Sequence, residues 1–129
     1  MTRPAEAPAV ELDHVQITVA RNDEAATLVF YRSVLGLQEI EKPDSLKKSG
    51  GAWFKIGSTE LHVSPEDVFL GNLESKRHVC FKTPNLSVFR RHLTAHGVEV
   101  IEDKQPVAGW VRFYVRDPGG NRIEIAQRL

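Results

Sequence analysis

The chain has 129 residues, which is enough for one compact domain with a substantial core. Seventeen acidic residues balance seventeen basic ones, so the composition gives no argument for a nucleic-acid or membrane-surface partner. No apolar run is long enough to span a bilayer. The single cysteine, Cys80, excludes an intrachain disulfide and agrees with a reducing compartment, so the sequence predicts a cytoplasmic protein.

The first elements follow from local patterning. Residues 1–11 are a leader containing several Ala and Pro residues, which we interpret as flexible and not as a signal peptide. Residues 12–20 alternate between apolar and polar side chains, which predicts a strand. Asn22 or Asp23 can cap a helix that runs to about residue 35, where Gly36 suits its C-terminal end.

The rest of the first half reads as strands and a loop. We expect a strand at 37–41, a mobile polar loop at 43–51, and a hairpin of strands 52–56 and 59–64 about Gly57-Ser58. Residues 65–76 are a connector without a strong period.

After the connector the same order begins again. We expect a strand at 77–83, a helix capped by Asn85 and ended by Gly97, a strand at 98–101, and a hairpin of strands 109–116 and 121–127 about the DPGGN turn. Strand-helix-strand-strand-strand therefore occurs twice, in repeats 12–64 and 77–127 of one domain spanning 12–127. This predicts an α+β fold: two paired βαβββ modules forming a cupped mixed sheet with the helices outside.

The polar positions of the strands lie on the sheet faces that the helices do not cover, and several of them carry side chains able to bind a metal. The rows consist of His14 and Gln16; Glu60 and His62; His78, Cys80 and Lys82; and Arg122 and Glu124. Imidazole and carboxylate groups are ligands that borderline divalent cations prefer. The alternative is a solvated sheet face, but such a face would typically be richer in Lys, Glu and Thr than in His. A histidine also opens both repeats, so we interpret the rows as a metal site.

Several segments resemble the vicinal oxygen chelate superfamily, which includes glyoxalase I, bleomycin-binding proteins, fosfomycin-resistance proteins and extradiol dioxygenases. The segments are DHVQITV, FYRSVLGL, ELHV, RHVCF and RDPGGNRIEI, and the resemblance covers residues 12–127. It implies a divalent metal, such as Zn, Ni, Co, Mn or Fe, held by His14, His78 and Glu124.

The fourth ligand is open between two side chains that share a face. The resemblance to glyoxalase I implies Glu60, whereas counting back along each hairpin makes His62 the repeat partner of Glu124. We favour His62 as the ligand and keep Glu60 as its rival or as a nearby general base. Glu60 and Glu124 are the candidate catalytic carboxylates.

The resemblance implies a metal-dependent lyase or isomerase of the glyoxalase type, acting on a small oxygen-chelating molecule. It also implies a homodimer, for which we expect His14 and His62 from one chain and His78 and Glu124 from the other. Two alternatives are a metal-free binding protein of the bleomycin-resistance kind and a fosfomycin-type thiol transferase. The transferase would need a cation-rich pocket, for which the sequence offers only scattered Lys82, Arg112 and Arg122.

Four further residues have modest expectations. We expect Cys80 to be a small core residue and not a nucleophile, because no base accompanies it. Trp53 is a strand aromatic that we expect in the core. Trp110 is also expected in the core, although it could instead wall the pocket. Arg112 is expected at the surface, with contact to an anionic substrate as the alternative.

Overall fold

The computed structural model describes residues 7–67 and 75–129. Its elements, in chain order, are β1 (His14–Ala20), η1 (Arg21–Asp23), α1 (Glu24–Val29), η2 (Phe30–Val34), β2 (Gln38–Ile40), η3 (Asp44–Ser49), β3 (Ala52–Ile56), β4 (Thr59–Glu66), β5 (His78–Lys82), α2 (Leu86–Ala95), β6 (Ile101–Glu102), β7 (Trp110–Arg116) and β8 (Arg122–Arg128). The α+β class and the repeated βαβββ order are confirmed.

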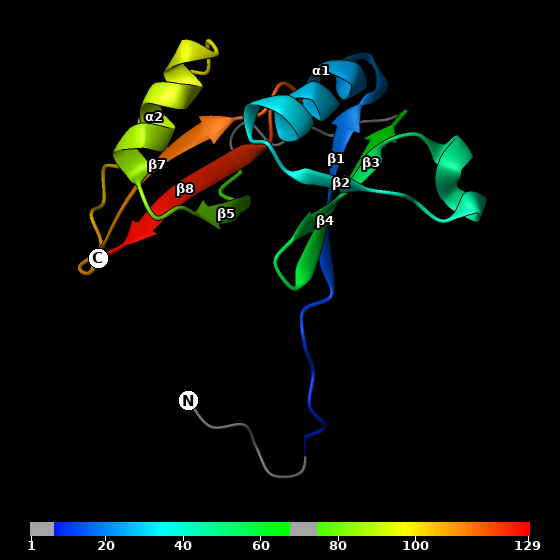
Figure 1. The fold of residues 1–129 in the computed structure, drawn as a ribbon, viewed down its shortest axis with the longest axis horizontal. Coiled ribbons are helices and arrows are strands. Elements are labelled where there is room, and N and C mark those ends of the chain that lie inside the picture. The colour runs from blue at the N-terminus through cyan, green and yellow to red at the C-terminus, as the bar shows by residue number, and fades with distance from the viewer. Residues whose placement is uncertain (1–6, 68–74) are drawn as a thin grey trace.

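Each module forms its own four-stranded mixed sheet. The strand orders are β1-β4-β3-β2 and β5-β8-β7-β6, with β1 parallel to β4, β5 parallel to β8, and the other neighbours antiparallel. Within the described residues the two paired modules thus each contribute one hydrogen-bonded mixed sheet. Figure 1 shows the two modules side by side, with α1 and α2 on the same side of the molecule.

The apolar faces of both sheets belong to one hydrophobic core. Strand alternation places Phe54 and Leu61 of the first sheet, and Phe113, Ile123 and Ile125 of the second, on the inner faces, where all five are buried. Residues of both helices complete the same core. Because successive side chains alternate, the polar rows lie on the opposite face of each sheet from this shared core.

The turn between β7 and β8 attaches the second module to the first. The Tyr31 hydroxyl, at the end of the first helix, donates to Asp117 Oδ2 over 2.6 Å, and Asn121 Nδ2 donates to the Thr18 carbonyl over 3.0 Å. Burial raises the pKa of both Tyr31 and Asp117 above their ordinary values. A Cβ at Gly119 would lie 2.5 Å from Val19 Cγ1, so the turn requires glycine for this close approach.

The two helices begin and end differently. Asn85 Oδ1 accepts from the Val88 N–H over 3.1 Å and caps α2 as predicted, whereas the Asp23 side chain makes no capping bond to α1. The helix begun by α1 continues as the π-helical turn η2 and ends near Gly36, whose φ is +70°.

Several boundaries differ from the sequence expectations. The polar loop 43–51 contains the 3-10 helix η3, and the Glu24 carboxylate accepts from the Gly51 N–H at its end. The strand expected at 98–101 is reduced to β6. In the connector, β4 extends through residue 66, and residues 68–74 lie outside the described residues.

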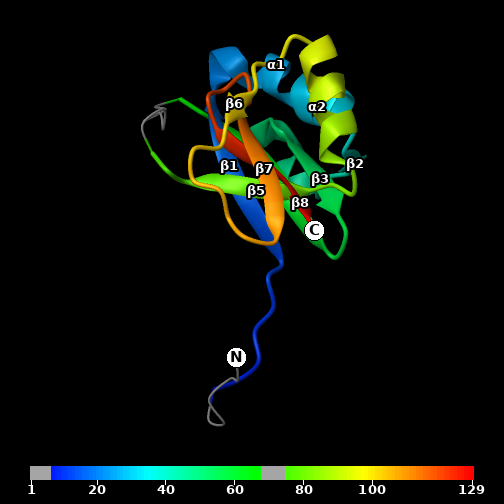
Figure 2. The same cartoon turned by 90° about the vertical axis from the view of Figure 1, so that its left-hand side faces the viewer.

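The leader contributes no regular element where it is described. Residues 7–13 precede β1 and extend away from both modules (Figure 2), whereas residues 1–6 lie outside the described part of the chain. Among the helices of the described residues, none combines the length and the hydropathy that crossing a bilayer requires.

Candidate metal centre

The first module brings His14 and His62 together on neighbouring strands. Their rings stack with centroids 4.1 Å apart, and Trp53 on β3 stacks on His62 with centroids 3.8 Å apart. Since β4 lies between β1 and β3, the three rings form one continuous stack across the polar face. His62 is only 4% exposed within it, so packing fixes the plane of its ring.

Two carboxylates contact these imidazoles. Glu60 Oε1 lies 2.9 Å from His62 Nε2, and Asp13 Oδ2 lies 2.8 Å from His14 Nδ1. A carboxylate that accepts from one ring nitrogen sets the tautomer and makes the ring a stronger ligand. We call His14, Glu60 and His62 the first half-site.

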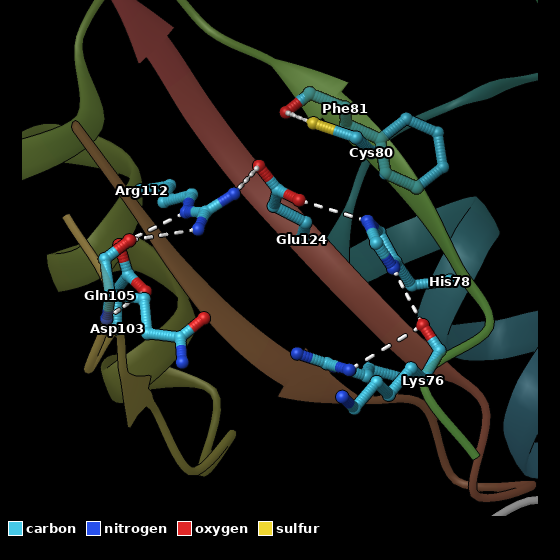
Figure 3. Close-up of polar contacts among 9 residues, drawn as sticks. Lys76, His78, Cys80, Phe81, Asp103, Gln105, Arg112 and Glu124 are labelled. Atoms are coloured by element: carbon cyan, nitrogen blue, oxygen red, sulfur yellow. Dashed lines mark hydrogen bonds and ion pairs between the residues drawn. The ribbon is translucent and has the colours of Figure 1, made fainter. Parts of the chain in front are cut away.

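The second module brings His78 and Glu124 together. His78 Nε2 lies 2.9 Å from Glu124 Oε1, and His78 Nδ1 donates to the Lys76 carbonyl over 2.9 Å (Figure 3). That bond places the Nδ1 proton on the far side of the ring and directs Nε2 towards the carboxylate. We call His78 and Glu124 the second half-site.

The Glu124 carboxylate is buried beside an arginine that the sequence placed at the surface. Glu124 is 2% exposed, and Arg112 Nη1 lies 3.6 Å from its Oε2. Asp103 and the Gln105 carbonyl hold the Arg112 guanidinium at 3.0 Å each (Figure 3). The Arg112 side chain is 15% exposed, so it is partly covered by these contacts.

Glu124 fits the role of a cation ligand. Its Oε2 is buried and has no hydrogen-bond partner in the described residues. Buried polar atoms are rarely left unsatisfied, and a divalent cation prefers such an oxygen. The donor set of imidazole nitrogens and carboxylate oxygens is also the chemistry that such an ion requires.

The strand register bears on the choice between His62 and Glu60. In the first module His62 pairs with Trp53 and with Gln16, which lies two residues after His14. In the second module Glu124 pairs with Tyr114 and with Cys80, which lies two residues after His78. His62 and Glu124 therefore occupy equivalent positions in the two modules, as the hairpin count predicted. Glu60 is equivalent to Arg122, since these two pair with the opening histidines.

The two half-sites are separate within one chain. Among residues 7–67 and 75–129, no three His, Cys, Asp or Glu side chains gather closely enough to hold a metal ion. Each half-site lies on the sheet face opposite the shared core. The chain therefore supplies two pairs of ligand-type side chains and brings each pair together on its own sheet.

Comparison with known proteins agrees with this architecture. The model of the Glyoxalase/Bleomycin resistance protein/Dioxygenase superfamily matches residues 11–125. The chain belongs to this superfamily. No curated protein matches the chain at a significant level.

Solved structures of this superfamily share the fold over nearly the whole chain. A glyoxalase family protein from Bacillus anthracis is 36% identical with a TM-score of 0.86, covering 96% of this chain and 99% of that one. A glyoxalase/dioxygenase from Nostoc punctiforme is 22% identical with a TM-score of 0.80, covering 100% and 99%. Lactoylglutathione lyase from Agrobacterium tumefaciens is 21% identical with a TM-score of 0.71, covering 93% and 95%. At the lower two identities the likeness shows the fold alone.

Two other sequence expectations are corrected around the half-sites. Cys80 is exposed on β5 and is not a core residue. Partial desolvation, followed by the nearby Glu124 carboxylate, raises the pKa of its thiol to about 11, so it is a poor nucleophile. Trp53, expected in the core, instead lies on the polar face against His62. Strand alternation could have predicted this position, because Trp53 and Phe54 are consecutive residues and therefore point to opposite faces of the sheet.

Proposed function

We propose that this superfamily member is a metal-dependent lyase or isomerase of the glyoxalase type, acting on a small molecule with two neighbouring oxygen atoms. The observation that carries the proposal is the pair of equivalent half-sites, one built on His14 and His62 and the other on His78 and Glu124. Members of the superfamily often use divalent metals and bind small molecules, which supports this assignment.

These four side chains would hold the ion, which when bound supplies Lewis-acid stabilisation of negative charge on a substrate oxygen. Glu124 contributes a carboxylate whose burial keeps water away from one side of the site. Arg112 holds that carboxylate from behind and partly balances its charge.

Glu60 is the residue that we assign to proton transfer. Its Oε1 contacts His62 Nε2, which places the Glu60 carboxylate beside the proposed ligands. There it would take a proton from a substrate carbon beside a carbonyl group. Its side chain is 36% exposed, which leaves it accessible to substrate.

We further propose a homodimer that joins the first half-site of one subunit to the second half-site of the other. Both half-sites lie on the sheet faces away from the core, and β1 and β5 are the edge strands of their sheets, so these surfaces are available to another chain. Dimers are common in the superfamily. Metal affinity and dimer affinity are then linked thermodynamically.

Metal analysis of the purified protein, followed by a substrate screen, tests the proposed function. We expect about one divalent ion per chain and turnover of a 2-oxoaldehyde in the presence of a thiol, abolished by a chelator and restored by metal. Catechols and fosfomycin form the other arms of the screen. Protein that binds a small molecule tightly but retains no metal after loading and dialysis would instead be a metal-free binding protein.

A further inference from the structure

A cavity of about 390 Å³ lies beside the second half-site, between the β6–β7 connection and the segment that leads into β5. Its size is within the range of sites for small molecules. Its lining includes five cationic side chains and two carboxylates, namely Lys76, Lys104, Arg112, Arg116 and Arg122 with Glu102 and Asp103. The whole chain has no net charge, so this is a local excess of positive charge.

The two carboxylates of the lining are already engaged by arginines. Asp103 pairs with Arg112 over 3.0 Å, and Glu102 pairs with Arg90, which is not part of the lining. In contrast, the ammonium groups of Lys76 and Lys104 have no hydrogen-bond or ion-pair partner among the described residues. Both lysines are exposed and line the cavity, so in the described residues no acidic side chain competes with an anion for them.

Arg122 is the third cation of the lining that forms no ion pair with a carboxylate in the described residues. Its guanidinium lies over the Tyr114 ring, 4.2 Å from the centroid, and it donates a long hydrogen bond of 3.4 Å to the Lys76 carbonyl. Stacking on an aromatic face fixes the guanidinium plane while leaving its N–H groups able to donate. A guanidinium presented in this way favours a planar or tetrahedral oxyanion.

The cavity and the second half-site share a wall. The Tyr114 ring lines the cavity and meets the His78 ring edge-on, with centroids 5.9 Å apart. Arg112 also lines the cavity and approaches Glu124. A small molecule with an oxyanion in the cavity would therefore extend directly towards the proposed metal ligands.

From this arrangement we infer that the cavity binds an anionic group of the substrate, a carboxylate, phosphonate or phosphate, through Lys76, Lys104 and Arg122. The inference deepens the proposed function, on which it rests for the assignment of the bound molecule as substrate. It narrows the substrate class to small oxygen-chelating molecules that also carry an oxyanion. The cavity brings together three cations that lie far apart in the sequence.

Calorimetric titration of metal-free protein with methylphosphonate and with acetate tests the inference without the proposed metal. We expect methylphosphonate to bind more tightly than acetate because its three oxygen atoms can interact with all three cations. Lys104→Gln and Arg122→Gln should each weaken its binding about tenfold. Lys48→Gln, which removes an exposed lysine far along the chain, should change the affinity less than about twofold.

A second measurement does not depend on variants. In wild-type protein, methylphosphonate should shift the backbone amide resonances of residues 101–105 and 112–122 selectively. Equal affinity of wild-type and Arg122→Gln protein, or shifts spread evenly over the chain, would overturn the inference. Because the titration uses metal-free protein, a negative result rejects the anion site and does not bear on the proposed metal chemistry. Conversely, a protein that binds the anion but takes up no metal would reject the proposed function and retain the anion site.

Discussion

His62 and Glu60 are in direct contact, yet their positions give them different expected roles. Packing between His14 and Trp53 buries the His62 ring, whereas Glu60 is partly exposed and contacts the metal site through His62. We expect His62→Ala to weaken metal binding by more than about 100-fold and Glu60→Gln by about tenfold or less. Equilibrium dialysis against a chelator-buffered metal would measure both.

The reverse order would contradict this assignment. If Glu60→Gln alone removed the metal, Glu60 would be the ligand, as the glyoxalase I resemblance implies, and the equivalence of His62 with Glu124 would concern strand register only. Glutamine is close to isosteric with glutamate, which makes the Glu60→Gln substitution a fair test of charge.

Tyr31 and Asp117 make a buried hydrogen bond across the junction of the two modules. Tyr31→Phe should lower the free energy of unfolding by about 1–3 kcal/mol near pH 7. Burial, and then Asp117, hold the pKa of Tyr31 well above its usual value of 10.0. The unfolded chain therefore loses this proton at a pH where the folded protein keeps it.

This difference predicts the sign of the pH dependence. The contribution of Tyr31 is fully present below its unfolded pKa and is lost as the pH rises above that value. The stability difference between wild type and Tyr31→Phe should therefore stay constant up to about pH 9 and shrink as the pH rises above about 10. Urea unfolding at one fixed protein concentration would show it, and a pH-independent difference would contradict the buried contact.

At the scale of elements, the two helix starts provide a matched pair. Asn85→Ala removes the side-chain bond to the Val88 N–H and should cost about 1 kcal/mol of stability. Asp23→Ala removes no capping bond and should cost only about 0.3 kcal/mol, through the helix dipole. Urea midpoints measured side by side would distinguish them, and equal losses would mean that Asp23 caps α1 in solution.

The elements that were predicted correctly are those whose sequence patterns, such as strand alternation and a turn glycine, lie within a few residues of each other. The hairpin strands β3 and β4, and β7 and β8, alternate cleanly around glycine-containing turns, so their period and their ends could both be read. The π-turn η2 could not be foreseen, because an apolar stripe does not distinguish the two hydrogen-bond spacings. The segment that follows the 3-10 helix η3 is held at Gly51 by Glu24, a residue far away in the sequence.

The same distinction explains the site. Alternation within strands placed the four ligand-type side chains on polar faces, and the repeat gave the equivalence of His62 and Glu124. The position of Arg112 beside Glu124 depends on Asp103 and Gln105 in a separate connection, and the cationic cavity gathers residues from three segments. Contacts of this kind are set by tertiary packing, which no local pattern reports.

At the scale of the whole molecule, the arrangement of the two modules decides where a complete metal site can form. The modules share one core between their inner sheet faces, and this leaves the half-sites on outer faces. A second chain that covers both outer faces would create two equivalent sites related by two-fold symmetry. Each site would then take ligands from both subunits.

Mixing two variants that each lack one ligand tests this claim most directly. Neither His14→Ala nor Glu124→Ala should retain metal alone, because every site in either homodimer lacks a ligand. In the mixed dimer one site takes His14 and His62 from one subunit and His78 and Glu124 from the other, and is intact. After unfolding and refolding an equal mixture, we predict about one tightly bound ion for every four chains, as random pairing requires. A mixture that retains no more metal than the separate variants would contradict a site shared between subunits.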